Sequence, residues 1–190
     1  MILRHYLEHH SDALKCLLGH ETMIEVLIEQ IVDTIEKKGK LILAGNGGSA
    51  ADAMHIAAEF VGRFRLERQP LPTLALTTDL SAITAVGNDY SFDEIFSRQL
   101  LALGNETDLL ICISTSGRSE NILRLIQAAN VKNIQTWLIT GQTCPSYEEI
   151  NILNITSTET SIIQEIYLTL LHYVCLQVEN RLFPQVTEIA

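Results

Sequence analysis

Apolar residues recur at helical spacing at both ends of the chain. Between residues 3 and 38 they fall three or four positions apart, with an interruption near Gly19, which predicts two amphipathic helices. Residues 161–182 place apolar side chains on most faces of a last helix. A helix of that kind is usually buried on several sides.

Short apolar runs alternate with helical patterns between these ends. Strands are predicted at residues 41–44, 73–77, 109–113 and 136–139, with a further edge strand at 151–155. Helices are predicted at residues 49–64, 80–87, 92–103 and 119–130. Short buried strands separated by helices are typical of a parallel sheet with crossover helices. The pattern therefore predicts an α/β fold.

The chain shows no internal boundary. No repeat, low-complexity segment or linker rich in Pro and Gly interrupts the 190 residues, so we expect one domain, residues 1–190. The N-terminal helical arm, residues 1–38, and the final helix carry more apolar surface than one sheet covers, which predicts a homo-oligomer with helices at the subunit interface. Only the stretch 141–149 has an irregular pattern.

Composition narrows the class of protein. With 23 acidic against 13 basic residues the net charge is −10, which argues against nucleic acid as a direct partner. No stretch reaches the roughly 18 apolar residues of a spanning helix, and the N-terminus lacks an apolar signal core. The four cysteines are widely spaced, as in reduced proteins. We expect a cytoplasmic protein outside the membrane.

Two loops follow predicted strands and lead directly into helices. The first is Gly45-Asn46-Gly47-Gly48-Ser49, which is either a plain tight turn or a place where backbone amides approach a ligand. The second is Ser114-Thr115-Ser116-Gly117-Arg118-Ser119, where Ser119 is a helix N-cap or a phosphate ligand. Because both lie at the carboxyl ends of parallel strands, together they favour an anionic ligand.

Polar residues also interrupt two apolar helices. His55 and Glu59 are four apart on the helix after the first loop, as a metal-binding or acid–base pair would be, and a solvated polar face is the alternative. Gln164 and His172 interrupt the last helix, where a single histidine is more often a core residue. Eight residues of helix separate these two by roughly 12 Å, so binding one metal requires extended side chains, a distorted helix or different subunits.

Four segments in this order resemble the sugar isomerase (SIS) domain, and specifically its phosphoheptose isomerase branch. They are GNGGSAADAMHIAAEF, VGNDYSFDEIFSRQL, ISTSGRS and IQEIYLTLLH, and the resemblance covers nearly the whole chain. It implies a three-layer sandwich with a five-stranded parallel sheet flanked by helices, assembled as a homotetramer with active sites at subunit interfaces. It also implies conversion of sedoheptulose 7-phosphate to D-glycero-D-manno-heptose 7-phosphate, toward the heptose of lipopolysaccharide or related glycans.

The resemblance also implies roles for individual residues. Glu59 and His172 match the catalytic positions, and one zinc ion per subunit is implied at His55, Glu59, Gln164 and His172. Asp52 and Arg63 match polar positions near the site, and we rank them below the other matched residues. The positions that match sugar and phosphate ligands are Asn46, Gly47, Gly48, Ser49, Glu59, Asn88, Asp89, Ser114, Thr115, Ser116, Ser119 and Gln164.

A hypothetical mechanism fits these residues. Glu59 moves a proton between the two carbons that exchange the carbonyl, while His172 exchanges protons with their oxygens. The chain departs from the family pattern in three places: the loop after Gly141 lacks an Asp-Gly-Gly segment, Ile162 stands where Arg is common, and Tyr167 where His is common. These departures affect the loop over the substrate and the ligand set.

One alternative belongs to another functional class. The same fold resembles DiaA, a tetrameric adaptor that binds the replication initiator DnaA, and the ending Asn180-Arg181-Leu182-Phe183-Pro184 is similar to the tail of that group. That group lacks the acid at the Glu59 position and the imidazole at the His172 position. Because this chain has both, we favour the enzyme. A sugar-phosphate sensor would carry a further domain.

Overall fold

Five parallel strands form a single sheet in the computed structural model, which describes residues 2–185. Met1 and residues 186–190 of the expected domain lie outside the described residues. The strand order is β2-β1-β3-β4-β5, so the first strand in the chain is next to the centre and β5 is an edge strand, as predicted. The strands are β1 (Leu41–Gly45), β2 (Thr73–Ala75), β3 (Leu109–Ser114), β4 (Gln135–Gly141) and β5 (Asn151–Ile155).

The helices begin and end within a few residues of most predicted bounds. The α-helices are α1 (Leu3–Lys15), α2 (Glu21–Glu36), α3 (Gly48–Val61), α4 (Leu80–Asp89), α5 (Ser97–Leu103), α6 (Glu120–Val131) and α7 (Thr160–Leu182). The 3-10 helices are η1 (Cys16–His20) and η2 (Phe92–Glu94).

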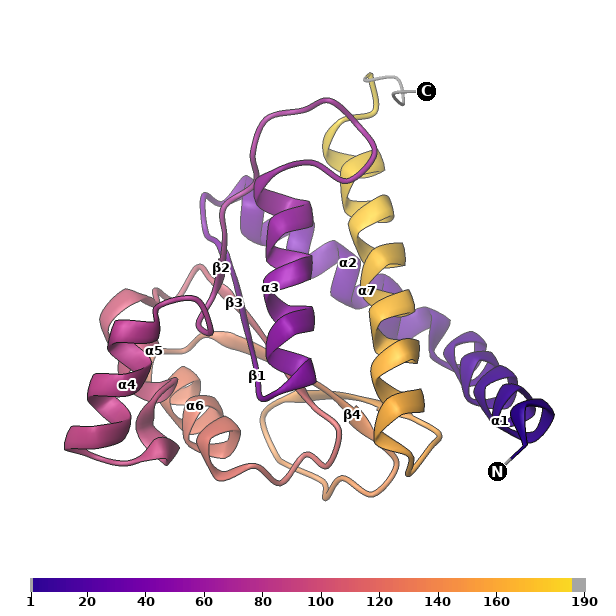
Figure 1. The fold of residues 1–190 in the computed structure, drawn as a ribbon. Helices are drawn as coiled ribbons and strands as arrows, with labels where there is room; N and C mark the ends of the chain where they lie inside the picture. Colours follow the sequence, from indigo (N-terminus) through magenta and orange to yellow (C-terminus); the bar gives the residue numbers. More distant parts are fainter. Residues whose placement is uncertain (1, 186–190) are drawn as a thin grey trace.

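Helices cover both faces of the sheet (Figure 1). Alternate residues of β1 enter different cores: Leu41 and Leu43 pack with α2, α3 and α7, whereas Ile42 and Ala44 pack with α5 and α6. This alternation follows from the pleat of a strand, and burial on both faces explains the continuous apolar runs. The predicted three-layer α/β architecture is confirmed.

The register of the central strands brings two loops together. Gly45 at the end of β1 pairs with Ile113 of β3, and Ser114 at the end of β3 pairs with Thr140 of β4. The loops after β1 and β3 therefore leave the same edge of the sheet, each leading into a helix. This is the edge at which open parallel sheets bind ligands.

The single helix predicted for residues 92–103 is wrong, because the structure divides it into η2 and α5. Ile95 and Phe96 lie between the two pieces and are both fully buried in the core. A break in the helix lets both neighbouring side chains enter that core, so tertiary packing overrides the helical pattern. Strand β2 is also two residues shorter than predicted, since the chain turns where Thr78 N–H donates to Ala75 O.

The two N-terminal helices play different roles. Helix α2 lies against the sheet and buries Leu27, Ile28 and Ile31 completely, so it belongs to the core. Helix α1 projects beyond α7 (Figure 1) and leaves Leu3 and Leu7 exposed. Only α1 therefore has the character of an arm.

Helix α7 is long and apolar enough to cross a membrane by length and composition. Half of its most apolar window is buried inside the fold, however, and it packs against α2 and α3. Its apolar character is thus explained by its position in the core. The four cysteines are free thiols.

Candidate active site

The cluster of His55, Glu59 and His172 is formed by two helices. His55 and Glu59 lie one turn apart on α3, and His172 comes from the neighbouring helix α7. One side-chain donor or acceptor atom of each lies within 4.8 Å of the others. His55 Nε2 is 3.1 Å from Glu59 Oε1 and 3.4 Å from His172 Nε2. Tertiary packing thus brings together three of the four predicted metal-ligating residues.

Hydrogen bonding alone satisfies this arrangement poorly. A neutral imidazole nitrogen either donates one hydrogen or accepts one. If His55 Nε2 donates to Glu59, its hydrogen is directed away from His172; if it accepts from His172, its lone pair faces a carboxylate. A cation among the three atoms would satisfy all of them, and histidine with carboxylate is a common ligand set for divalent metals.

The cluster lies at the surface of the chain. The His55 side chain is 44% exposed and that of Glu59 is 23% exposed, so small molecules have access. Burial lowers the pKa of His172 below its ordinary value, the nearby His55 lowers it further, and Glu59 opposes both. His172 is accordingly neutral near pH 7, the form that binds a metal or accepts a proton.

The loop after β1 is shaped by its glycines. Gly47 has a φ of +55° at the N-cap of α3, a conformation that only glycine adopts without strain. A Cβ on Gly48 would lie 2.4 Å from Gln164 Nε2, so the absence of a side chain lets α7 approach this turn. Gly48 and Ser49 are the first two residues of α3, where backbone N–H groups have no intrahelical partner and are available to an anion.

Asn46 links the two loops. Its side-chain amide exchanges two hydrogen bonds of 2.8 Å with the amide of Asn121, which is buried in the first turn of α6. The interaction ties the end of β1 to the helix that follows β3. It holds Asn46 in one orientation and sets the spacing of the two loops.

The loop after β3 keeps its hydroxyl groups available. Ser119 is the N-cap residue of α6, but its side chain makes no capping hydrogen bond. Ser114 Oγ accepts from Gly117 N–H inside the turn, and Ser116 is exposed. Ser119 therefore occupies the N-cap position without using its hydroxyl as a cap. The Ser119 hydroxyl is available to a ligand.

The irregular segment 141–149 lies against this loop. Tyr147 OH donates to Gly117 O at 2.7 Å, and Arg118 donates to Thr143 O at 3.0 Å. The segment therefore borders the Ser114–Ser119 turn, even without the Asp-Gly-Gly sequence of the family.

Gln164 lies near the starts of α3 and α7, away from His172. It is half-buried beside Gly48, two turns before His172 on α7. Next to it, Tyr167 OH and Ser49 Oγ are 2.8 Å apart, and Asp52 also interacts with this phenol. Burial raises the pKa of Tyr167, so the phenol stays protonated.

Further predicted residues are not brought to the histidine cluster within one chain. Asn88 and Asp89 are exposed at the end of α4, and the Asn88 amide donates to Asp89. Helix α4 packs in the layer of α5 and α6, on the opposite face of the sheet from α3 and α7. Arg63 is half-exposed and near Glu67.

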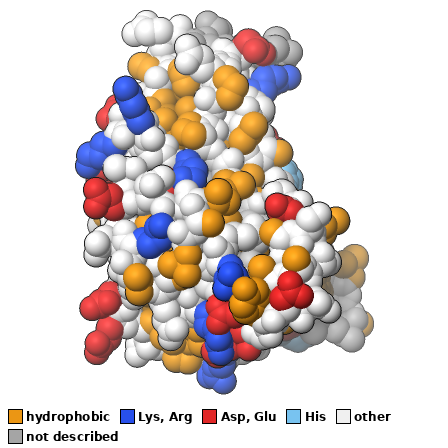
Figure 2. Space-filling view, turned by 90° about the vertical axis from the view of Figure 1, so that its left-hand side faces the viewer, with side chains coloured by type: hydrophobic (Ala, Val, Ile, Leu, Met, Phe, Trp, Pro, Cys, Tyr) orange, Lys and Arg blue, Asp and Glu red, His pale blue; other side chains and the backbone are white. Residues whose placement is uncertain are grey.

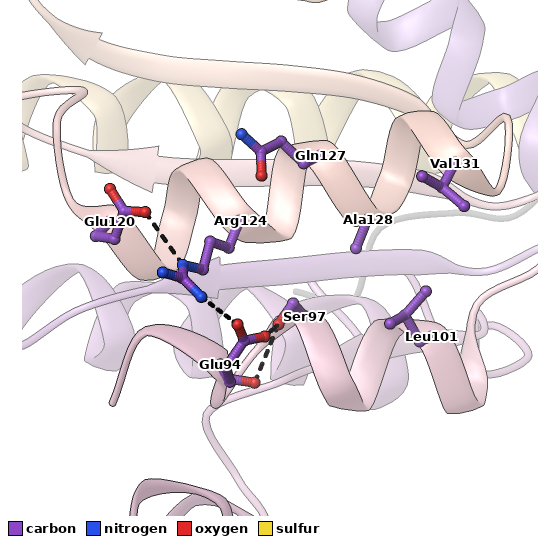
Figure 3. Close-up of a pocket in the computed structure, with 8 residues that line it drawn as sticks. All are labelled: Glu94, Ser97, Leu101, Glu120, Arg124, Gln127, Ala128 and Val131. Atoms are coloured by element: carbon purple, nitrogen blue, oxygen red, sulfur yellow. Dashed lines mark hydrogen bonds and ion pairs between the residues drawn. The ribbon is translucent and has the colours of Figure 1, made fainter. Parts of the chain in front are cut away.

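A shallow depression of about 400 Å³ lies between α5 and α6 and contains none of the predicted site residues (Figure 3). Arg124 reaches across it and pairs with Glu94 and Glu120. Ser97 Oγ donates to the same Glu94 carboxylate. Because the guanidinium is already paired twice, the depression offers a ligand little free charge.

Sequence reasoning missed several residues around the site. Asn121 lies two residues after the Ser114–Ser119 loop, and Glu179 is one more charged residue in the apolar last helix that was not singled out. Phe64 stacks on His172 with ring centroids 5.6 Å apart and an interplanar angle of 12°. An aromatic residue near the end of a helix carries no distinctive signal, so only the structure identifies it.

The fold and the site agree with one family of known proteins. The family model of the SIS domain matches residues 5–141, which defines the class of this chain. A phosphoheptose isomerase of Geobacter sulfurreducens is 49% identical over 158 residues, covering 82% of this chain and 84% of that protein. One of Campylobacter concisus is 41% identical over 181 residues, covering 94% and 96%. The chain belongs to the phosphoheptose isomerase family of SIS domain proteins.

Solved structures agree with this assignment. The structure of a phosphoheptose isomerase from Francisella tularensis has a TM-score of 0.87 at 34% identity, covering 94% of this chain and 96% of that one. The phosphoheptose isomerase from Neisseria gonorrhoeae has a TM-score of 0.80 at 34% identity, covering 94% and 99%.

Proposed function

We propose that this chain catalyses the aldose–ketose isomerisation of sedoheptulose 7-phosphate to D-glycero-D-manno-heptose 7-phosphate. Its family membership over most of its length supports this reaction. The observation that carries the proposal is the convergence of His55, Glu59 and His172 from two helices. A carboxylate beside imidazoles at an accessible surface provides the general acid and base that proton transfer next to a carbonyl requires.

Glu59 is the proposed base. The carboxylate removes a proton from the carbon beside the carbonyl and returns it to the neighbouring carbon, which requires both carbons to lie within about 3 Å of it. His172, which is neutral near pH 7, passes a proton between the two oxygens as the enediol of the sugar forms and collapses. Carbon and oxygen protons are conserved overall, so the reaction needs no redox partner.

The donor atoms fit a zinc ion. With Zn–N bonds of about 2.0–2.1 Å, tetrahedral ligands lie about 3.3 Å apart. The His55 nitrogen is 3.1 Å from Glu59 and 3.4 Å from His172, and all three ligand atoms lie within 4.8 Å of one another. When bound, zinc would polarise the oxygens of the substrate. Gln164 completes the predicted ligand set, and because it lies two turns from His172, we propose that a neighbouring subunit supplies it.

The two sheet-edge loops are the proposed phosphate site. Helix α3 begins at Gly48 and helix α6 begins after its N-cap Ser119, both at the same edge of the sheet. The free N–H groups of these helix starts can bind an anion, and Thr115 and Ser116 add hydroxyls. Such local donors act within a Debye length of about 8 Å, so they offset the negative charge of the whole chain. Asn88 and Asp89 would contact the sugar from a neighbouring subunit.

A homotetramer in the cytoplasm is the proposed working form, in heptose synthesis for lipopolysaccharide or a related glycan. Leu3, Leu7 and Leu18 are exposed on α1 and η1. A cavity of about 660 Å³ beside Leu18 and Tyr173 lies between η1, the start of α2 and helix α7. On the side of α4, by contrast, hydrophobic side chains are interspersed with charged ones (Figure 2). The exposed leucines of α1 and η1 support assembly through this part of the chain.

The DnaA-binding adaptor receives no support from these relatives, which are phosphoheptose isomerases. An adaptor also has no use for three converging metal-type ligands.

The test is turnover of sedoheptulose 7-phosphate by the purified protein, after chelation and after addition of Zn²⁺, beside His172→Ala. We expect activity that chelation removes, that Zn²⁺ restores and that the variant lacks. The partly exposed His20 of η1, whose ring contacts Asn154 O and not the cluster, provides the control, because His20→Ala leaves the cluster intact and should retain activity. Absence of turnover from a folded tetramer in every condition would refute the enzyme and favour the adaptor.

A further inference from the structure

A buried ion pair connects the end of α3 to α7, next to the cluster of His55, Glu59 and His172. Arg68 Nε donates to Glu179 Oε1 at 2.7 Å, and both side chains are only 1% exposed. Glu179 lies on α7 seven residues after His172, so the two side chains project from the same side of the helix. Both charged groups are shielded from solvent, and protein groups supply their hydrogen bonds and counter-charge.

Arg68 completes the end of α3. Its guanidinium donates to Glu59 O at 2.7 Å and to Phe60 O at 2.8 Å. Both are carbonyls of the last turn of α3, which have no intrahelical partner, and Phe60 O also accepts from Leu71 N–H. A cation is also favoured there by the helix dipole. The side chain therefore holds the backbone of the residue that we assign as the base.

Glu179 holds the segment that follows α3. Its carboxylate accepts from the N–H groups of Phe64 and Arg65, both at 2.9 Å, and of Leu66 at 3.2 Å. These bonds set the path of the chain where the Phe64 ring stacks on the imidazole of His172. The other side of the cluster is formed by His55, whose ring meets that of His172 edge-on at 5.0 Å.

We propose that Arg68, Glu179 and Phe64 are positioning residues for the isomerase site. The ion pair fixes the end of α3 against α7, and Phe64 holds the His172 ring toward His55 and Glu59. The inference rests on the function proposed for that cluster, and it assigns none of the three to contact with the substrate.

The positions of the hydrogen bonds distinguish this role from general stabilisation. A buried pair that served stability alone could be replaced by apolar residues with little loss. Here the hydrogen-bond partners of the pair include the Glu59 carbonyl and the Phe64 N–H, each part of a residue that forms or touches the cluster. A displacement of about 1 Å in such a group can cost up to about 10²-fold in rate.

The primary test replaces the ring while keeping an apolar side chain. For Phe64→Leu we expect kcat to fall about tenfold with KM within about twofold, because orientation and not substrate contact is lost. Zn²⁺ affinity of the metal-free protein, measured by competition with a chromophoric chelator, should fall about tenfold, as for other residues that orient metal ligands. Phe64→Tyr retains the ring and should restore both values.

The matched control is Phe96→Leu. Phe96 is 1% exposed in the core on the other face of the sheet, so its loss should lower Tm at least as much as Phe64→Leu while leaving kcat and Zn²⁺ affinity unchanged. Glu179→Gln, which keeps the shape but loses the charge, should reproduce the Phe64→Leu effects if it folds. If it does not fold, the Phe64 series decides.

Wild-type kcat and Zn²⁺ affinity in Phe64→Leu would overturn the positioning role. An equal loss of kcat and Zn²⁺ affinity in Phe64→Leu and Phe96→Leu would also overturn the positioning role, since both losses would then follow from lower stability. If the wild type itself lacks isomerase activity, the proposed function fails. Positioning of the cluster is then judged by Zn²⁺ affinity alone, so the two failures are distinguishable.

Discussion

The two regions of the candidate site are built in different ways. The loops after β1 and β3 consist of consecutive residues at one edge of the sheet, and each leads into the N-terminus of a helix. The helix-pair cluster joins His55 to His172 across 117 positions in the chain. A cradle for an anion is thus a local property of a strand–turn–helix segment, whereas the acid–base and metal chemistry exists only once α3 packs on α7.

The regions also differ in what keeps them in place. Glycine geometry and the Asn46–Asn121 amide pair shape the loops. The helix pair depends on side-chain packing and on the buried Arg68–Glu179 interaction. We therefore expect substitution of the loop hydroxyls to change substrate affinity and substitution of the loop glycine Gly47 to change stability slightly. Substitutions in the helix pair should have larger effects on turnover or stability.

The largest expected effect is loss of the base. Glu59→Gln should lower kcat by about 10²–10⁴-fold, the usual contribution of a positioned proton-transfer group. The check is steady-state kinetics on the folded variant, with Glu67→Gln as a nearby exposed control. Near-normal turnover would mean that another group removes the proton.

The next effect concerns the stability of the helix pair. Burial raises the pKa of Glu179, but the N–H groups of Arg65, Phe64 and Leu66 and the Arg68 charge outweigh it and hold this pKa below its ordinary value. Glu179→Gln should cost about 3 kcal/mol of unfolding free energy near neutral pH, because it leaves Arg68 buried without a counter-charge.

The same residue predicts a pH dependence. A lowered carboxyl pKa contributes stability that is fully present above the unfolded value of about 4.3 and is lost as pH falls through the folded value. The difference in unfolding free energy between wild type and Glu179→Gln, from denaturant titrations, should therefore be constant above about pH 6 and shrink below about pH 4. A difference that grows in acid would contradict this.

A smaller effect is expected in the loop after β3. Ser116→Ala should raise KM about tenfold with kcat nearly unchanged, because a hydrogen bond to a charged group contributes about 1.5 kcal/mol to binding. Ser81→Ala, on the exposed first turn of α4, is the control. An equal loss of kcat would place Ser116 in the chemical step and would break the contrast between the regions.

The smallest effect tests the backbone of the first loop. Gly47→Ala should lower the unfolding free energy by about 1 kcal/mol, because its φ of +55° is strained for any residue with a Cβ. Gly19→Ala is the matched control, since a Cβ there meets no atom within 4 Å. Thermal denaturation of both variants gives the comparison, and equal Tm values would show that the loop relaxes.

Much of the fold was predictable because its signals are local. Alternating apolar strands and helices predicted the parallel sheet, and the strand bounds are within two residues of the structure. The helix predicted at 92–103 failed because the burial of Ile95 and Phe96 depends on the opposing core, which periodicity does not report. The family resemblance identified His55, Glu59 and His172, but only the packing of α3 on α7 places their donor atoms together.

The sequence by itself determined the helix and strand pattern, the two loops at strand ends and the family. Each of these depends on residues close together in the chain or on motifs in a fixed order. Tertiary structure alone decided that Gln164 lies beside Gly48, that Asn46 pairs with Asn121, and that a buried ion pair lies next to the cluster. These contacts join distant segments, and their geometry arises only when the helices pack on the sheet.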